Sequence, residues 1–368
     1  MKTKLVRAAD ALKSDAAKIM YLKYGVSLLV TVLLGSILIY AQGVSPGYAM
    51  TEVVKGAFGS LYKLGNTLRW TAPCLMLGIA ASVAFKAGVS NLGLSGQCAI
   101  GGLVAAVIGY SVELPPVAHV LLCVFAAGFS GMLYVLVPAI MRLFFGINEF
   151  IVTLMLNFVA EIMSEYTVDM ILTASGEYTS ATSTPSILPS AQIPIMIPNT
   201  SVSYSLLIAV LVAVALYALY KYTLPGYELK QTGENLRFAK VGGVKVVRNF
   251  LLIFLLSGFI AGASGGIEVM GVYKKFNVGF ATNLGWDGIM VARIAESNPI
   301  ACIFVAFIWG ALKAGSLQIE RVTELNRFTV ECMKMFFVLM VSIDYERLFY
   351  SMKYAIVRRK RAAAMKEA

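Results

Sequence analysis

The chain has 368 residues, of which 58% are hydrophobic and only 14% are charged. A soluble domain has about 45–50% apolar and about 25% charged residues, so this composition excludes a soluble globular protein and indicates a polytopic membrane protein. The net charge of +11 does not indicate nucleic acid binding, because the basic residues occupy the gaps between apolar runs, where they set membrane topology.

The amino-terminal segment combines spaced basic residues with apolar ones. Residues 1–23 therefore predict an amphipathic helix lying on the cytoplasmic membrane surface. The apolar run at 24–42 is too long for the hydrophobic region of a typical signal peptide, so we expect an uncleaved first span.

Ten segments satisfy or approach the length of about 20 apolar residues that a membrane span needs. They predict an all-α polytopic protein with a transmembrane domain over 24–350. The predicted spans are 24–42, 67–86, 97–113, 116–141, 149–172, 204–222, 249–270, 285–298, 299–316 and 328–348, of which the eighth is short and polar. Residues 51–64 are too brief to span and predict an outer interfacial helix.

The distribution of lysine and arginine predicts the orientation of these spans. Most basic residues fall at the amino terminus, in 221–248 and in the basic tail 351–368, whereas the long loop 173–203 has no lysine or arginine. Because cytoplasmic segments carry the excess of basic residues, we expect both termini and 221–248 inside, and 173–203 outside as an irregular loop.

One short pattern occurs twice, as Asn91-Leu92-Gly93…Gly96 and as Asn283-Leu284-Gly285…Gly288. Each copy separates two apolar segments, and the span count places the first on the cytoplasmic side and the second on the outer side. Paired glycine-broken segments of opposite orientation are typical of inverted-repeat transporters. Such backbone must line a cavity or be buried in protein, so we expect the two halves to meet near these glycines.

Polar residues around the two copies are candidates for a substrate path. Ser95 and Asp287 occupy the same slot; each either caps the helix that follows or lies where a positive helix end faces a central cavity. Further candidates are Asn91, Gln97 and Asn283, which suit a neutral polyhydroxy ligand, and Trp286, which either stacks on a ring or lies in an interfacial belt. Asn157 lies within an apolar run, so it either contacts substrate or holds helices together.

The cytoplasmic segment 221–248 predicts a short surface helix at about Asn235–Lys240. Gly233 precedes this helix and the Gly242-Gly243 pair follows it, as at helix ends. Such a helix could lie on the membrane surface and dock a partner; the alternative is an ordinary solvated loop.

Charged residues in the later spans predict local pairs. Arg293 with Glu296, and Glu331 with Lys334, are each three residues apart, so we expect ion pairs on one helix face rather than a proton relay. Glu268 ends the seventh predicted span and is expected to meet water. The Gly258…Gly262 step predicts helix packing, not a nucleotide fingerprint.

The sequence predicts no chemistry of its own. It has no Gly-x-x-x-x-Gly-Lys-Ser/Thr motif, so ATP-driven work would need a second polypeptide. His119 is the single histidine and the five cysteines lack ligand spacing, so we expect no metal site, no catalytic residue and no bound cofactor.

Four stretches together resemble one class of bacterial ABC-importer permeases, those for branched-chain amino acids, simple sugars and nucleosides. They run in family order from about 50 to 320 and are Asn91–Gln97, the Gly146–Asn157 run Gly-Ile-Asn-Glu-Phe-Ile-Val-Thr-Leu-Met-Leu-Asn, Gly233–Gly243, and the glycine-rich Ser257–Gly266 with Gly285–Ile289. The second run is most similar to the nucleoside-type branch. Ser95 departs from the family, whose acidic residue it replaces.

The resemblance implies a permease subunit that moves nucleosides or simple sugars by alternating access. It assigns docking of a cytoplasmic ATPase, which binds ATP and magnesium, to Gly233, Glu234, Asn235, Arg237, Ala239, Gly242 and Gly243. It also implies a substrate-binding protein, a second permease that is usually a different chain, an ATPase with two fused nucleotide domains, and a bacterial plasma membrane location. From the residues alone, an ion-coupled secondary transporter and a lipid-modifying membrane enzyme remain alternatives.

Overall fold

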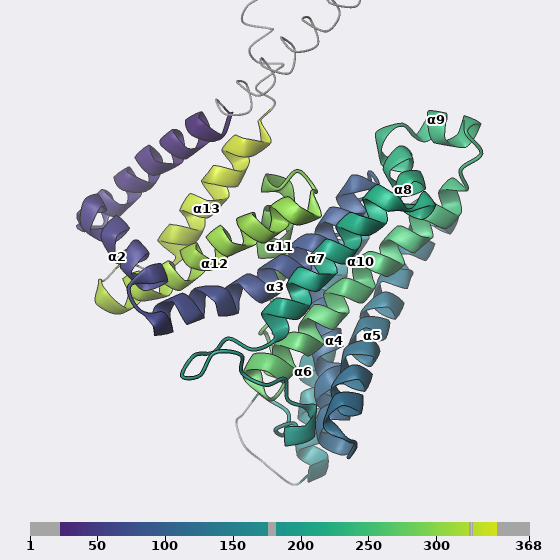
Figure 1. Cartoon of the computed structure of the whole chain (residues 1–368), viewed down its shortest axis with the longest axis horizontal. Coiled ribbons are helices and arrows are strands. Elements are labelled where there is room, and N and C mark those ends of the chain that lie inside the picture. The colour runs from purple at the N-terminus through teal and green to yellow at the C-terminus, as the bar shows by residue number, and fades with distance from the viewer. Residues whose placement is uncertain (1–22, 176–181, 324, 326, 344–368) are drawn as a thin grey trace, which may run out of the picture. The chain divides into compact units, whose positions relative to one another are not determined.

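The computed structural model describes residues 23–175, 182–323, 325 and 327–343 (Figure 1). The segments predicted at 1–22 and 351–368 therefore lie outside the described residues. Regular structure within the described ranges is helical, and β-pairing there is limited to two isolated bridges. The chain divides into two compact units, one formed by Met1–Met50 with Ile319–Ala368 and the other by Thr51–Gln318.

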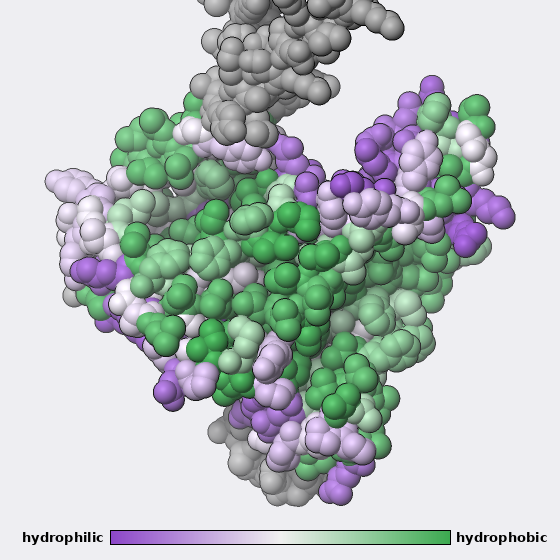
Figure 2. All heavy atoms as spheres, viewed as in Figure 1, coloured by the Kyte–Doolittle hydropathy of each residue, from purple (hydrophilic) through white to green (hydrophobic). Residues whose placement is uncertain are grey.

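The larger unit holds most of the helices. They are α3 (Leu61–Lys86), α4 (Leu94–Ser111), α5 (Pro116–Phe145), α6 (Glu149–Ser175), the short turn η1 (Pro189–Ala191), α7 (Ser205–Tyr222), α8 (Leu224–Glu234), α9 (Leu236–Val241), α10 (Val246–Glu268) with its π-helical extension η2 (Val269–Tyr273), α11 (Leu284–Ile294) and most of α12 (Pro299–Val322). In Figure 2, hydrophobic side chains cover the middle of this unit, and hydrophilic ones gather at the end that carries α8 and α9. That distribution is expected of helices surrounded by lipid.

The smaller unit contains the first long helix, Lys23–Ala41, and α13 (Arg327–Ser342). The helix α2 (Pro46–Phe58) crosses the boundary between the units. Within α13, the Lys334 ammonium lies 4.0 Å from the Glu331 carboxylate, which confirms the predicted pair.

Eight described helices are long and apolar enough to span a membrane, and they correspond to the first seven and the ninth predicted spans. The eighth predicted span is wrong as a full crossing. Its helix, α11, has 11 residues and is therefore only about 16 Å long, about half the thickness of a bilayer core. The tenth begins as predicted, at Arg327, and its last residues lie outside the described range.

Small residues on α10 let it pack directly on the backbones of α4 and α5. A Cβ atom at Gly265 would lie 1.8 Å from the carbonyl oxygen of Cys98 in α4, and one at Gly262 would lie 2.3 Å from that of Ala127 in α5. Only glycine permits such an approach, so the predicted packing role of this glycine-rich stretch is confirmed.

Gly265→Ala is expected to lower the free energy of unfolding by about 1–3 kcal/mol, because α4 and α10 must separate to admit the methyl group. Denaturing-detergent titration of the purified full-length chain would measure this loss. Gly25→Ala is the matched control, since a Cβ atom there meets nothing within 4 Å. Equal stability of the two variants would contradict the packing argument.

The chain between α10 and α11 leaves helical geometry. Lys274 follows η2 with a φ of 61°, and its ammonium donates to the carbonyl oxygen of Met270 at 2.7 Å. Burial lowers the pKa of Lys274. The described part of the predicted irregular loop is ordered against this segment: Ile187 N donates to Lys274 O at 2.9 Å and Thr184 N to Phe276 O at 3.0 Å.

Candidate functional site

The two glycine-containing tetrads touch. Ser95, in the first turn of α4, donates its hydroxyl to the carbonyl oxygen of Thr282, just before α11, at 3.1 Å. A Cβ atom at Gly285 would lie 2.4 Å from the Ser95 hydroxyl. The prediction that the copies lie on opposite sides is therefore wrong, whereas the prediction that the halves meet at these glycines is confirmed.

From this meeting point α4 and α11 run in opposite directions. At the far end of α4, Gly109 accepts a hydrogen bond from Leu188 N at 2.8 Å, in the loop that precedes α7. At the far end of α11, the Arg293 guanidinium lies 4.7 Å above the ring of Phe85, which is next to the last residue of α3. Two helices that diverge from apposed amino termini match the expectation of inverted halves.

The predicted helix caps are wrong. The N-cap residues are Gly93 for α4 and Asn283 for α11, and neither makes a side-chain cap hydrogen bond. The second helix begins two residues earlier in the repeated pattern, which places Asp287 inside its first turns. There the buried Asp287 carboxylate accepts from Trp309 Nε1 at 2.7 Å and pairs with the ammonium of Lys313.

Two of the candidate path residues form a buried polar cluster instead of lining a pocket. Asn91 Nδ2 donates to Gln97 Oε1 at 3.0 Å, and Gln97 Nε2 donates back to Asn91 Oδ1 at 2.9 Å. Asn91 Oδ1 also accepts from Gly93 N at 3.1 Å. These bonds fix the turn that leads into α4.

The candidate path residue Asn283 is exposed and is not among the residues that line the pocket described below.

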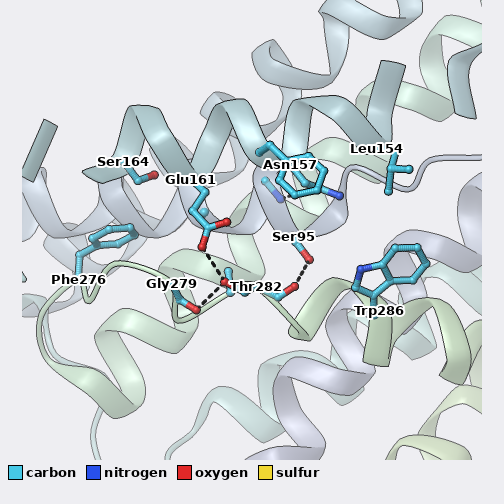
Figure 3. Close-up of a pocket in the computed structure, with 13 residues that line it drawn as sticks. Ser95, Leu154, Asn157, Glu161, Ser164, Phe276, Gly279, Thr282 and Trp286 are labelled. Carbon is cyan, nitrogen blue, oxygen red and sulfur yellow. Dashed lines mark hydrogen bonds between the residues drawn. The ribbon is translucent and has the colours of Figure 1, made fainter. Parts of the chain in front are cut away.

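An open pocket with a cavity volume of about 130 Å³ lies between α4, α6 and the segment 276–286 (Figure 3). Three predicted residues line it: Ser95, Asn157 and Trp286. The α6 residues that line it run from Leu154 to Ser164, around the middle of that helix, which is about 40 Å long. The pocket is therefore near the middle of the membrane, where transporters of this architecture bind substrate.

Asn157 performs the helix-holding role that the sequence left open. Its Oδ1 accepts from Gly96 N at 2.8 Å, and its Nδ2 donates to Leu92 O at 2.9 Å. It thereby ties α6 to the turn before α4 while also lining the pocket. Trp286 is half-buried and lines the pocket at the start of α11.

Sequence reasoning missed two polar residues that lie together in this pocket. Glu161 on α6 accepts a hydrogen bond from the Thr282 hydroxyl at 3.2 Å. A signal existed, because Glu161, Glu165 and Asp169 recur every four residues and define a polar side of α6. A carboxylate at this depth costs about 2.5–3.5 kcal/mol in lipid, so such a side must face protein or water.

The remaining charge predictions need correction. Glu268 does not meet water: its side chain is 2% exposed, and it lies 2.6 Å from the Arg69 guanidinium of α3. The reason is that η2 continues the helix beyond Glu268, which is therefore not at the end of the span. Arg293 and Glu296 do not share a helix face, since α11 ends at Ile294 and Glu296 has a φ of 50°.

At one end of the unit, α9 forms the predicted surface helix. Asn235 caps it by accepting from Phe238 N at 3.0 Å, and Gly242 ends it. The structure thus contradicts the solvated-loop alternative. Ala239 is 1% exposed and anchors α9, whereas Val241 is 90% exposed. The other exposed residues of the segment are Glu234, Asn235, Leu236, Arg237, Phe238, Lys240, Gly242 and Gly243.

One very close contact with α3 contributes to the position of α8 and α9. A Cβ atom at Gly233 would lie 2.1 Å from the carbonyl oxygen of Lys86 and 2.8 Å from Ala87 Cα. At Gly243 the backbone is left-handed, with a φ of 79°, which favours glycine. The result is a small, rigidly mounted surface that presents both apolar and charged side chains.

Comparisons with known proteins agree on one family. The family model described as "Branched-chain amino acid transport system / permease component" matches residues 63–343. The guanosine ABC transporter permease protein NupP of Bacillus subtilis is 27% identical over 84% of this chain and 90% of its own length. The nucleoside permease NupB of Lactococcus lactis is 25% identical, with coverages of 77% and 80%. The glucose permease TsgB13 of Haloferax volcanii is 27% identical, with 82% of each chain covered.

Proposed function

Because the chain belongs to the family of permease components of the branched-chain amino acid transport type, it is a membrane-spanning subunit of an ABC importer, and we propose that its substrate is a nucleoside. Two of the three relatives above are named for nucleosides or guanosine, and one for glucose. Simple sugars are therefore the second candidate substrate class.

The observation that carries the proposal is the pairing of a mid-membrane pocket with a rigid docking surface. The pocket lies where α4 and α11 diverge, so a rotation of either helix changes its shape. The exposed side of α9, with Leu236, Phe238 and Val241, offers apolar side chains to a partner. An importer needs both, because work done by the ATPase must reach the substrate.

We also propose that this chain assembles with an ATPase, a second permease and a substrate-binding protein. An ABC permease works with an ATPase and, in importers, a substrate-binding protein. Here the second permease is a different chain, and the ATPase carries two fused nucleotide domains that hold ATP and magnesium, so this chain itself binds no cofactor. Both termini and α9 lie in the cytoplasm of a bacterial cell, and the substrate-binding protein delivers its ligand at the opposite face.

Affinity purification of the tagged full-length chain in mild detergent tests the assembly. We expect an ABC ATPase and a second permease to co-purify with wild type. The test variant, Leu236→Ser/Phe238→Ser, lacks two of the exposed apolar side chains of α9, and it should enter the membrane normally and lose the ATPase. Retention of the ATPase by this variant would contradict docking at α9.

Competition uptake tests the substrate class. Cells expressing the complete transporter are expected to take up labelled guanosine, with unlabelled cytidine competing and ribose not competing. Uptake should stop when ATP is depleted and persist when ion gradients are collapsed. Uptake that follows the ion gradient would instead indicate a secondary transporter, and strong competition by ribose or glucose would indicate a sugar importer.

A further inference from the structure

Two polar groups in the mid-membrane pocket have hydrogen-bonding capacity that the protein does not use. Glu161 and Ser164 are three residues apart on α6 and both line the pocket (Figure 3). Ser164 is only 1% exposed, and its hydroxyl has no hydrogen-bond partner among the described residues. A buried hydroxyl without a partner is costly, so a ligand hydroxyl placed beside it would be stabilised.

The Glu161 carboxylate accepts one hydrogen bond from the described residues, and that bond is shared. It comes from the hydroxyl of Thr282, whose oxygen also lies 2.9 Å from the carbonyl oxygen of Gly279. One hydroxyl proton can serve only one of these acceptors at a time. A carboxylate has about four lone-pair sites, so Glu161 can accept hydrogen bonds from two neighbouring ligand hydroxyls.

The rest of the wall restricts the ligand to a neutral one. No described residue that lines the pocket is basic, so an anionic ligand would meet Glu161 without a compensating cation. Phe158, Phe276 and Trp286 contribute aromatic surface around the carboxylate. Carboxylate acceptors beside aromatic surface suit a neutral ring that carries adjacent hydroxyl groups.

We propose that this pocket is a subsite for the vicinal hydroxyls of a furanose ring. Glu161 accepts a hydrogen bond from both hydroxyls, and Ser164 bonds one of them. The choice of a ribonucleoside as ligand rests on the proposed function. The subsite makes the permease itself selective for ligands with an intact diol, in addition to any selection by the substrate-binding protein.

Ligand titration of the purified full-length chain in lipid nanodiscs tests the subsite. The probes are uridine and 2′,3′-dideoxyuridine, which lacks the diol, and the readout is tryptophan fluorescence, with Trp286→Phe identifying the signal of the pocket. We expect uridine to quench saturably. Glu161→Gln should weaken uridine binding about tenfold, as for loss of hydrogen bonds to a charged group, and Ser164→Ala should weaken it less.

The decisive comparison is between ligands and between neighbouring carboxylates. Dideoxyuridine should bind more weakly than uridine to wild type and equally to wild type and Glu161→Gln, which also shows that the variant is folded. Glu165 lies one helical turn from Glu161, is exposed and does not line the pocket. Glu165→Gln removes the same charge as Glu161→Gln and should leave uridine binding unchanged.

An equal loss for both ligands in Glu161→Gln would show a structural role and overturn the proposal. So would unchanged uridine binding in that variant, or the absence of saturable quenching in wild type. The titration requires no ATP and no partner, so its failure is distinct from failure of the proposed function. Saturable uridine binding without ATP-driven uptake would refute the proposed importer function alone. ATP-driven uptake without saturable binding would refute the diol subsite alone.

Discussion

Glu268→Gln is expected to lower the free energy of unfolding by about 3–5 kcal/mol, the largest stability effect of any single substitution considered for this chain. Arg69 and Glu268 join α3 to α10 at 2.6 Å, and their side chains are 7% and 2% exposed. One nitrogen of the Arg69 guanidinium, Nη1, already lacks a hydrogen-bond partner within the part of the chain that the structure describes. Removing the carboxylate would leave a buried cation uncompensated.

Two further variants separate the charge from the packing. Arg69→Met/Glu268→Leu removes both charges and should be close to wild type, because the desolvation cost of the pair disappears with its attraction. Glu234→Gln removes one partner of the exposed pair with Lys230, which lies at 3.6 Å, and should change stability by less than about 0.5 kcal/mol. Denaturing-detergent titration measures all three. A Glu268→Gln variant as stable as Glu234→Gln would contradict the argument.

Gly233→Ala is expected to reduce ATP-driven uptake about tenfold or more while leaving the amount of protein in the membrane unchanged. The new methyl group would lie 2.1 Å from the carbonyl oxygen of Lys86, so α8 and α9 must shift from the end of α3. Relieving such a clash costs about 1–3 kcal/mol, and about 1.4 kcal/mol corresponds to a tenfold change in an equilibrium.

Gly242→Ala is the matched control for this variant. It adds the same methyl group at the other end of α9, where the nearest atom, the carbonyl oxygen of Phe238, would be 3.4 Å away. Its uptake should therefore fall by much less than that of Gly233→Ala. If Gly233→Ala supports ATP-driven uptake at the wild-type rate, the fixed position of α9 is not required for transport.

Local signals in the sequence were sufficient to predict the short surface helix α9. The helix at Leu236–Val241 depends on its own cap, Asn235, and on the glycines that flank it, all within a few residues. For the same reason most spans were predicted, since a long apolar run is a property of one segment. The segment 285–298 was wrongly predicted as a span although it is short and polar, because the sequence alone does not show that helix α11 ends at Ile294.

Contacts between distant residues explain what sequence reasoning missed. Asp287 pairs with Trp309 and Lys313, and no spacing rule links residues so far apart in the chain. Glu268 forms an ion pair with Arg69, which lies in a helix nearly two hundred residues earlier in the chain. Glu161 was missed for a different reason: its spacing from Glu165 was visible, but only the fold shows that Thr282 and the pocket face it.

The placement of α3 has a mechanical consequence. This single helix touches Gly233 at its last residue, and two turns earlier Gly78 and Leu77 lie against Val291 and Gly288 of α11. A displacement of α8 and α9 by the partner proposed above would therefore reach α11 and the pocket through α3. Substitutions that make α3 more flexible between these two contacts should uncouple the transporter, so that its ATPase hydrolyses ATP without substrate transport.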